Sequence, residues 1–448
     1  MKINDEITSI SIEKLVNEGL ALNYINNKTV LIYNAIPGDI VTIKIIKKKK
    51  RIFFAKVIKI EKKSEFRKTS NCIHSKTCGG CIYQEIDYAT QIKFKETVLK
   101  DIINYNLPEL ENIVWPIKKC NKIQYHRNKM EFAFSKKDSK LILGLKEKNS
   151  FDNVVEVEDC KLLSKESNEF LKFTTNYFSN INIELWDSRE QKGCLSHLAI
   201  RHSKAFDNYM VNIKAHSYND TFNNYATALT KEYKKITSVN LILINEKKGS
   251  PTTTQSINLI GTKTLKENIG DLTFLISPLS FFQTNTEQTN ILYDTIKELA
   301  SIKENSKLLD LYCGTGTIGL YLCDKEGFVT GIEEIEAAIE NAKENANINK
   351  IKNTNFYAGK VKNILKFNEF DITTIIVDPP RSGMTPKALK RTAELRCKDI
   401  IYVSCNPITL MRDIKEFIKL NYKVTHLIPV DMFPHTYHLE CVVKLRLN

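Results

Sequence analysis

A cysteine in the last third of the chain is a candidate for covalent chemistry. Cys405 follows the apolar run 400–403 and precedes Asn406 and Pro407, so it lies between a predicted strand and a predicted helix. Because a helix start favours negative charge, we expect a lowered thiol pKa and a reactive thiolate at Cys405. Most cysteines are inert core residues, but no other cysteine of this region combines a strand end, an adjacent amide and a following proline.

Two carboxylates accompany this cysteine. Asp378 follows the apolar run 373–377 and begins an Asp-Pro-Pro-Arg segment, whose prolines would hold the polar groups in fixed directions. Glu440 precedes the apolar run 441–443. Burial in a strand would raise the pKa of Glu440 and suit it to accepting a proton. An outward-facing position would instead make Glu440 an ordinary surface residue.

A glycine-rich segment has the form of a ligand-binding loop. An apolar strand is followed by Gly314, Gly316 and Gly319, which let a ligand approach the backbone at the start of a helix. About 20 residues further on, Glu333 ends the next apolar run, where a carboxylate can accept hydrogen bonds from ribose hydroxyls. The spacing lacks the full dinucleotide fingerprint, which favours S-adenosylmethionine over a nicotinamide cofactor. A purely structural loop is the alternative.

A thiolate, a carboxylate base and a methyl donor together fit methylation of uracil at carbon 5. This carbon is too weak a nucleophile to attack a sulfonium methyl group unaided, but addition of a thiolate at carbon 6 converts the ring to an enolate. A base must then remove the carbon 5 proton before the enzyme is released. Cys405 would be the nucleophile and Glu440 the base. A cytosine-5 methyltransferase would place a proline directly before its nucleophile, whereas Ser404 stands there.

The elements that must position these residues suggest three domains, since domains average about 150 residues and the chain has 448. Residues 276–448 alternate six apolar runs with helical stretches, which predicts an α/β, Rossmann-like doubly wound sheet. Short strand-like runs in residues 1–62 predict a small, OB-like β-barrel. Residues 63–275 mix both patterns and predict a central α+β domain.

The charge distribution predicts a polyanionic partner, in particular RNA. The chain has 66 Lys and Arg against 52 Asp and Glu, and residues 44–68 hold twelve of the basic residues and only two acids. A solvated lysine face is the alternative. No run of about 18 apolar residues occurs and the start lacks a secretory signal, so we expect a cytoplasmic chain without a membrane anchor.

Three further cysteines have the spacing of metal ligands. Cys72, Cys78 and Cys81 enclose two glycines, which would allow the loop to wrap around a metal. A closed site requires a fourth ligand, and the spacing alone fits either zinc or an iron–sulfur cluster. In a reducing compartment, such cysteines indicate metal binding before disulfide formation.

The order of these motifs resembles that of the RNA uracil-5 methyltransferases, and among them the iron–sulfur enzymes that form 5-methyluridine in 23S ribosomal RNA. The resemblance spans nearly the whole chain and rests on residues 281–285, the glycine loop, 378–381, 404–407 and 438–440. It implies a nucleophile at Cys405 and a base at Glu440. It also implies that S-adenosylmethionine is bound by Gln283, Tyr312, Gly314, Glu333 and Asp378.

The same resemblance extends to the other two predicted domains. It implies that Cys160 joins Cys72, Cys78 and Cys81 as ligands of a [4Fe-4S] cluster with a structural or RNA-orienting role, zinc being the alternative. Residues 1–62 resemble a TRAM domain, a small RNA-binding barrel. We expect a monomer that methylates 23S ribosomal RNA. The alternatives are a transfer RNA uridine-5 methyltransferase and a non-catalytic iron–sulfur RNA-binding protein.

The sequence does not determine the contacts of two phenylalanines or of one stretch at the end of the predicted third strand. Phe281 or Phe282 would either stack on an extruded uracil or belong to the core. Residues 357–360 carry no acid, although related methyltransferases often hold the adenine amino group with one there.

Overall fold

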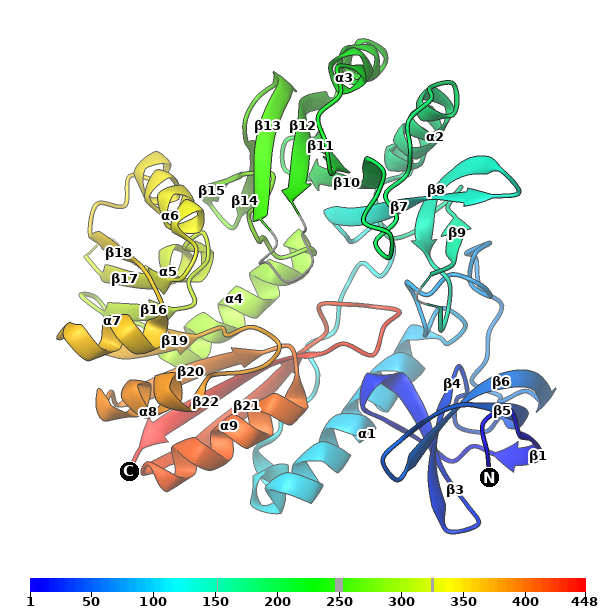
Figure 1. The fold of residues 1–448 in the computed structure, drawn as a ribbon. Coiled ribbons are helices and arrows are strands. Elements are labelled where there is room, and N and C mark those ends of the chain that lie inside the picture. Colours follow the sequence, from blue (N-terminus) through cyan, green and yellow to red (C-terminus); the bar gives the residue numbers. More distant parts are fainter. Residues whose placement is uncertain (151, 246–252, 324–325) are drawn as a thin grey trace.

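The computed structural model describes residues 1–150, 152–245, 253–323 and 326–448. Within these residues the strands form three large sheets and one separate hairpin (Figure 1). The N-terminal sheet lies at the lower right of Figure 1, the central sheet at the top and the C-terminal sheet at the left. No described helix is long and apolar enough to cross a membrane.

The N-terminal sheet contains six strands among the described residues, in the order β1-β5-β6-β4-β3-β2. The bounds are β1 Glu6–Ser11, β2 Lys14–Val16, β3 Leu20–Ile25, β4 Lys28–Tyr33, β5 Ile40–Lys49 and β6 Ile52–Lys62, with the 3₁₀ helix η1 at Asn17–Gly19. Asn26 and Asn27 join β3 to β4 with φ values of 50° and 59°, as a two-residue type I′ turn requires. The predicted strand-rich N-terminal unit is therefore confirmed.

The central sheet has the order β13-β12-β11-β10-β7-β8-β9 and is mixed, because β11 and β12 are parallel while the other pairs are antiparallel. The bounds are β7 Lys129–Lys137, β8 Lys140–Lys146, β9 Val154–Glu156, α2 Lys165–Ser179, β10 Leu195–Ser203, β11 Asn208–Ala215, α3 Thr221–Glu232, β12 Ile236–Asn245 and β13 Thr253–Gly261. Aromatic residues of α2 and α3, Phe170 and Tyr225 among them, pack on the strands. A hairpin of β14 (Leu265–Ile269) and β15 (Leu272–Ile276) follows.

The C-terminal sheet has the order β18-β17-β16-β19-β20-β22-β21, and the pairs from β18 to β20 are parallel. The bounds are α4 Thr286–Ala300, β16 Lys307–Leu311, α5 Thr317–Leu322, β17 Phe328–Glu333, α6 Glu336–Ile348, β18 Thr354–Ala358, α7 Val361–Phe367, β19 Thr374–Val377, α8 Pro386–Glu394, β20 Asp399–Ser404, α9 Pro407–Lys419, β21 Tyr422–Val430 and β22 Glu440–Leu447. All six apolar runs predicted to be strands are strands. The strand β22 runs antiparallel between β20 and β21, a direction that the sequence pattern did not indicate.

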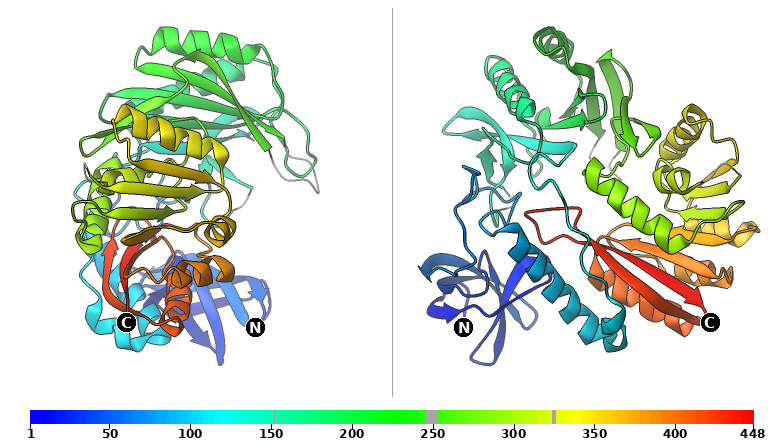
Figure 2. Two further views of the ribbon diagram at one scale, coloured as in Figure 1. Left: turned by 90° about the vertical axis from the view of Figure 1, so that its left-hand side faces the viewer. Right: turned by 180° about the vertical axis from the view of Figure 1, so that it is seen from behind.

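Helices cover both faces of this sheet, as the predicted doubly wound fold requires. Apolar residues of α4, α5 and α6 share one core with the strands, and those of α7, α8 and α9 share another. Figure 2, seen from behind, shows α4 across the face opposite to α9. The sheet is thus buried on both sides, which explains why its strands are almost entirely apolar.

Helix α1 (Tyr88–Asn106) connects the N-terminal half of the chain with the C-terminal sheet. The Asp87 side chain caps it by accepting a hydrogen bond from the Thr90 N–H at 3.0 Å. Its buried face, with Ile92, Leu99 and Ile103, belongs to the core on the α7–α9 side of that sheet. The short 3₁₀ helix η2 (Pro108–Ile113) follows it.

Candidate active site

The predicted site residues lie at one edge of the C-terminal sheet. Strands β16, β17, β19 and β20 are parallel, so the residues that follow them emerge on the same side. Asp378, Cys405 and the loop that begins after Leu311 follow their strands, and Glu333 is the last residue of β17. Strand β22 is antiparallel to β20 and begins at this edge with Glu440. The topology therefore brings together residues that are far apart in the sequence.

The loop after β16 has the open backbone that a bound ligand needs. Tyr312, Gly314 and Gly316 have positive φ values of 65°, 54° and 77°. A Cβ built on Gly314 would meet no atom within 4 Å, so open space faces this residue. The Glu333 carboxylate accepts a hydrogen bond from the Gly314 N–H at 3.2 Å and one from the Ile335 N–H at 2.9 Å. These bonds fix Glu333 beside the open space and leave lone pairs for ribose hydroxyls.

Close packing holds the helix after this loop against the sheet. A Cβ on Gly319 would lie 2.7 Å from Val329 Cγ1, so only glycine fits there without a shift. The Gly319 N–H donates to Asp310 Oδ2 at 2.9 Å. Burial, which is the main cause, raises the pKa of Asp310 to about 8. Asp310 therefore stabilises the start of this helix through the hydrogen bond from Gly319, a role that was not predicted from the sequence.

Gln283 and Asp378 lie on the loops before α4 and after β19. Gln283 is buried, and its backbone carbonyl accepts a hydrogen bond from Asn128 Nδ2 at 2.8 Å. Asn128 also donates to the Thr286 hydroxyl at 2.8 Å, so the central domain positions the start of α4. Burial raises the pKa of Asp378 to about 7. In the neighbouring segment Phe282 belongs to the core, whereas Phe281 is 68% exposed.

Cys405 and Glu440 are neighbours across the β20–β22 pair. Ser404 pairs with Cys441, so continuing the antiparallel register by one residue sets Cys405 opposite Glu440. Glu440 is 5% exposed, which removes the surface alternative for this residue. Burial, and then the charge of Asp378, raises the pKa of Glu440 to about 8.

The expectation of a lowered thiol pKa at Cys405 is wrong. Burial raises the pKa of the Cys405 thiol to about 11, and the carboxylates of Glu440 and Asp378 add to this increase. The Arg381 guanidinium acts in the opposite direction. The effect of the α9 start is too small to balance burial and two nearby acids. A reactive thiolate at this position therefore requires a change in its electrostatic surroundings.

Arg381 belongs to the Asp-Pro-Pro-Arg segment and is tied to the cysteine loop. Its carbonyl oxygen accepts hydrogen bonds from Asn406 Nδ2 and the Thr409 hydroxyl, both at 3.2 Å. Its Nη2 donates to the Tyr437 hydroxyl at 3.4 Å. One residue thus joins the loops after β19 and β20 to the loop that precedes β22. Its proximity to Cys405 was not predicted from the sequence.

The loop between β21 and β22 is anchored on α1. Lys95 Nζ donates to Asp431 Oδ1 at 2.6 Å, and both side chains are almost fully buried. The Tyr88 hydroxyl donates to Asp431 Oδ2 at 2.8 Å, and the His435 N–H donates to Gln91 Oε1 at 2.8 Å. These contacts fix the segment that leads to Glu440. No local sequence pattern indicated that α1 has this function.

Cys405 opens into a very small cavity. The cavity holds about 30 Å³ and is also lined by Arg381, Tyr437 and His438, together with Glu18 of η1. This volume is close to that of one water molecule, so any larger ligand requires the surrounding loops to move. The N-terminal part of the chain therefore contributes directly to the surroundings of Cys405.

The four predicted metal-binding cysteines line a second narrow cavity, although they come from two distant segments. Cys72, Cys78, Cys81 and Cys160 surround a space of about 20 Å³. Burial and the neighbouring sulfur atoms raise the pKa of the Cys81 thiol. In the described part of the chain, no three His, Cys, Asp or Glu side chains are placed closely enough to hold a metal ion. The donor set fits an iron–sulfur or zinc site in its chemistry but not yet in its distances.

Comparison with known proteins matches two parts of the chain, which together span most of its length, to protein families. Residues 87–448 match the sequence profile of the tRNA (Uracil-5-)-methyltransferases, and residues 6–58 match that of the TRAM domain. The chain is 33% identical over 445 residues to an uncharacterized RNA methyltransferase of Caldanaerobacter subterraneus, with 98% of each chain covered. It is also 33% identical over 441 residues to one of Thermotoga maritima, covering 98% of this chain and 99% of the relative.

A solved structure has the same arrangement over almost the full length. The tRNA (uracil-54, C5)-methyltransferase of Pyrococcus abyssi, in complex with S-adenosyl-L-homocysteine, superposes with a TM-score of 0.76 and 27% sequence identity. The match covers 98% of this chain and 100% of the archaeal chain.

Proposed function

The chain belongs to the tRNA (uracil-5-)-methyltransferase family, and on that premise we propose that it methylates carbon 5 of a uridine in 23S ribosomal RNA. It is an S-adenosylmethionine-dependent RNA (uracil-5-)-methyltransferase with an N-terminal TRAM domain. The observation that carries the carbon 5 chemistry is the position of Cys405 opposite the buried Glu440, at the sheet edge that also holds the glycine loop, and the four cysteines at residues 72, 78, 81 and 160 favour the ribosomal substrate through the resemblance described above.

We propose that Gln283, Tyr312, Gly314, Glu333 and Asp378 bind S-adenosylmethionine. Glu333 is oriented to accept from the ribose hydroxyls, and Gly314 leaves room for the ligand. When bound, the cofactor supplies an electrophilic methyl group on a cationic sulfur. Burial raises the pKa of Asp378 and of Glu440, and a cation beside them would stabilise their ionised forms, which supports a site for a sulfonium ion.

The same electrostatics would control the nucleophile. With a pKa of about 11, only about one Cys405 thiol in ten thousand is ionised at pH 7. Arg381 favours the thiolate, and a cationic ligand held beside Asp378 and Glu440 would offset whatever negative charge these two carboxyl groups carry. Cys405 then adds to carbon 6 of the uracil, and Glu440 accepts the proton from carbon 5 after methyl transfer. Elimination of the thiolate completes the reaction.

The assignment to ribosomal RNA is tested by labelling. Transcripts of 23S ribosomal RNA and of transfer RNAs are incubated separately with the enzyme and tritiated S-adenosylmethionine, and the products are digested to nucleosides. We expect 5-methyluridine in the ribosomal transcript. Because the Pyrococcus abyssi neighbour is a transfer RNA enzyme, transfer RNA is the second candidate, and exclusive labelling of transfer RNA would refute the ribosomal assignment.

We propose that Cys72, Cys78, Cys81 and Cys160 hold a [4Fe-4S] cluster. Their convergence on one cavity supports a four-thiolate site. Metal analysis and the visible absorption of anaerobically purified protein test this assignment. We expect iron and sulfide in the wild-type protein and their loss in Cys160→Ala. Zinc alone in the wild-type protein would contradict the cluster.

We propose that residues 1–62 bind RNA phosphates, that residues 63–275 carry the cluster and that residues 276–448 hold the reacting groups, in a monomeric cytoplasmic enzyme. The ends of β5 and β6 hold the densest run of basic residues, Lys47 to Arg51, and these side chains are exposed. The family match begins at residue 87, and α1 packs on the C-terminal sheet. This helix therefore belongs with the catalytic core in its packing, although it lies within the central range.

A further inference from the structure

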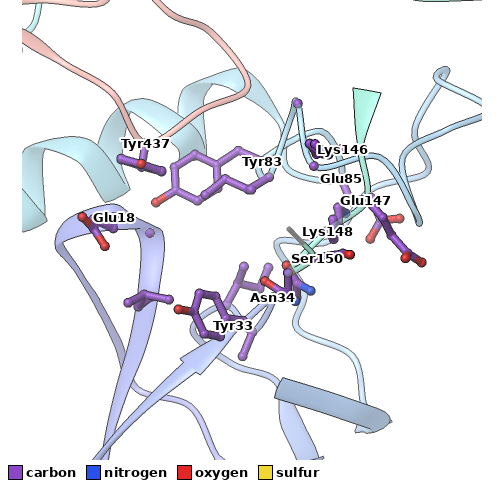
Figure 3. A pocket seen from close by; sticks show the side chains of 18 of the residues that line it. Glu18, Tyr33, Asn34, Tyr83, Glu85, Lys146, Glu147, Lys148, Ser150 and Tyr437 are labelled. Carbon is purple, nitrogen blue, oxygen red and sulfur yellow. The ribbon is translucent and has the colours of Figure 1, made fainter. Parts of the chain in front are cut away.

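A large cavity adjoins the nucleophile and has no role in the reaction described above (Figure 3). Its volume is about 600 Å³, within the range of about 300–1,000 Å³ that small-molecule sites occupy. The walls come from the N-terminal sheet, the cysteine-rich segment, residues 145–150 at the end of β8 and beyond it, and the loop that precedes β22. The cavity therefore lies where the three parts of the chain meet.

Aromatic rings form much of the cavity wall. Tyr33 and Phe54, on the neighbouring strands β4 and β6, stack at 6.3 Å between ring centroids and are only half-buried. In Figure 3, Tyr33 and Tyr83 face the same space from opposite sides. Accessible rings of this kind are the surfaces on which proteins stack unpaired RNA bases.

The cavity shares part of its wall with the small cavity at Cys405. Glu18, Tyr83 and Tyr437 line both this cavity and the small one at the thiol. Gly19 lets the N-terminal sheet pack closely against the segment that contains Ile82. It has a φ of +67°, and a Cβ there would lie 2.5 Å from the Ile82 side chain. A nucleotide that flanks a uridine bound at Cys405 is therefore within reach of this cavity.

The charges around the cavity fit a nucleotide better than an apolar ligand. Lys47 lines it and begins the exposed basic run described above. Lys146 also lines it and is exposed, whereas Lys148 is half-buried and donates a hydrogen bond to the Ser75 carbonyl. Of the acids, Glu85 is paired with Arg67 at 3.1 Å, and Glu18 and Glu147 are the others that line the cavity. Lys47 and Lys146 thus supply positive charge for phosphates, while the rings remain available to a base.

We propose that this cavity binds an unpaired base of the RNA that flanks the target uridine, with the base stacked on Tyr33. The proposal rests on the proposed function, because it takes RNA to be the substrate. It gives the enzyme a second point of recognition, since the target base and a flanking base would leave the RNA stack together. Selection among uridines would then depend on the flanking nucleotide as well as on the uridine itself.

The test measures binding without turnover. The probe is a short fluorescein-labelled RNA with one uridine in an oligoadenylate sequence, and fluorescence anisotropy is recorded without cofactor. Stacking on one ring accounts for about 1–3 kcal/mol, so Tyr33→Ala should bind the probe about 5- to 150-fold more weakly. Tyr33→Phe keeps the ring and should bind like the wild type. Tyr24→Ala removes a 69% exposed tyrosine of the same sheet that does not line the cavity, and it should have no effect.

Probes with an abasic residue at each flanking position identify the base. For one of these abasic probes, the affinity for the wild type should equal the affinity of the intact probe for Tyr33→Ala. The same abasic probe should bind Tyr33→Ala and the wild type equally well. Unchanged binding of Tyr33→Ala, or losses that add at every position, would overturn the proposal. If Tyr33→Ala fails to fold by circular dichroism, Tyr33→Leu, which keeps apolar packing, takes its place.

Methyl transfer to ribosomal and transfer RNA separates this proposal from the proposed function. An enzyme that binds the probes as expected but methylates no RNA would disprove the function and leave the base site in place. An enzyme that methylates RNA but is unaffected by Tyr33→Ala would disprove the base site alone.

Discussion

Replacing Glu440 by Gln should separate the two halves of the reaction. The amide keeps the size of the side chain but cannot accept the carbon 5 proton, and loss of a general base lowers a rate by about 10²- to 10⁴-fold. Adduct formation should not be slowed, because Glu440 is, after burial, the largest cause of the raised Cys405 pKa. A protein–RNA adduct that carries the methyl group should therefore accumulate.

The pH dependence of the second half follows from the pKa of Glu440. With a value of about 8, roughly one carboxylate in ten is ionised at pH 7 and half at pH 8. A base acts only when ionised, so the release step of the wild type should accelerate about fivefold over this interval and at most about twofold more above it. No sulfonium cation remains after methyl transfer to lower this pKa. The Gln variant should show no such increase.

The assay is single turnover with radiolabelled RNA, followed by denaturing gel electrophoresis, which resolves adduct from free RNA over time. Glu394→Gln is the matched control, because this glutamate is exposed on α8 and does not line the cavity at Cys405. Release from the Glu440→Gln adduct at the wild-type rate, or a flat wild-type profile between pH 7 and 8, would refute the assignment of the base.

Three other changes have expected outcomes of their own. Cys405→Ala should abolish methyl transfer with an unchanged circular dichroism spectrum, and RNA containing 5-fluorouridine should be trapped by the wild type only; turnover by the variant would exclude this nucleophile. Lys95→Met should lower the free energy of unfolding in urea by about 3–5 kcal/mol, because it leaves the Asp431 carboxylate buried without its cation, and an unchanged midpoint would contradict this. Lys48→Ala and Lys49→Ala should weaken RNA binding and reduce its dependence on salt concentration, and a slope equal to that of the wild type would show that neither contacts phosphate.

The sequence predicted the strands of the catalytic sheet and the positions of its polar loops because both are local features. Apolar runs marked the six predicted strands, and the residues that end them fell at one edge. The direction of β22 was not predictable, since an apolar run has no information about which neighbour it pairs with. The match of both sequence profiles confirms the family and the TRAM domain that the motifs suggested.

Tertiary contacts explain what the sequence did not reveal. The pKa of Cys405 was expected to be lowered by the adjacent helix, but burial and the acids from β19 and β22 raise it. The ion pair of Lys95 and Asp431 joins residues separated by 336 positions. Neither residue has a neighbour in sequence that would identify the other. The cavity beside Tyr33 exists only because three separate parts of the chain meet.

The placement of β22 determines when the sheet edge that carries Cys405 is completed during synthesis of the chain. This strand follows β20 and β21 in the chain yet lies between them, so it inserts only after both have been synthesised. Until then the proposed nucleophile lacks the partner that would free it from RNA. The centre at this sheet edge is therefore complete only after β22 has been synthesised and has paired with both of its neighbours.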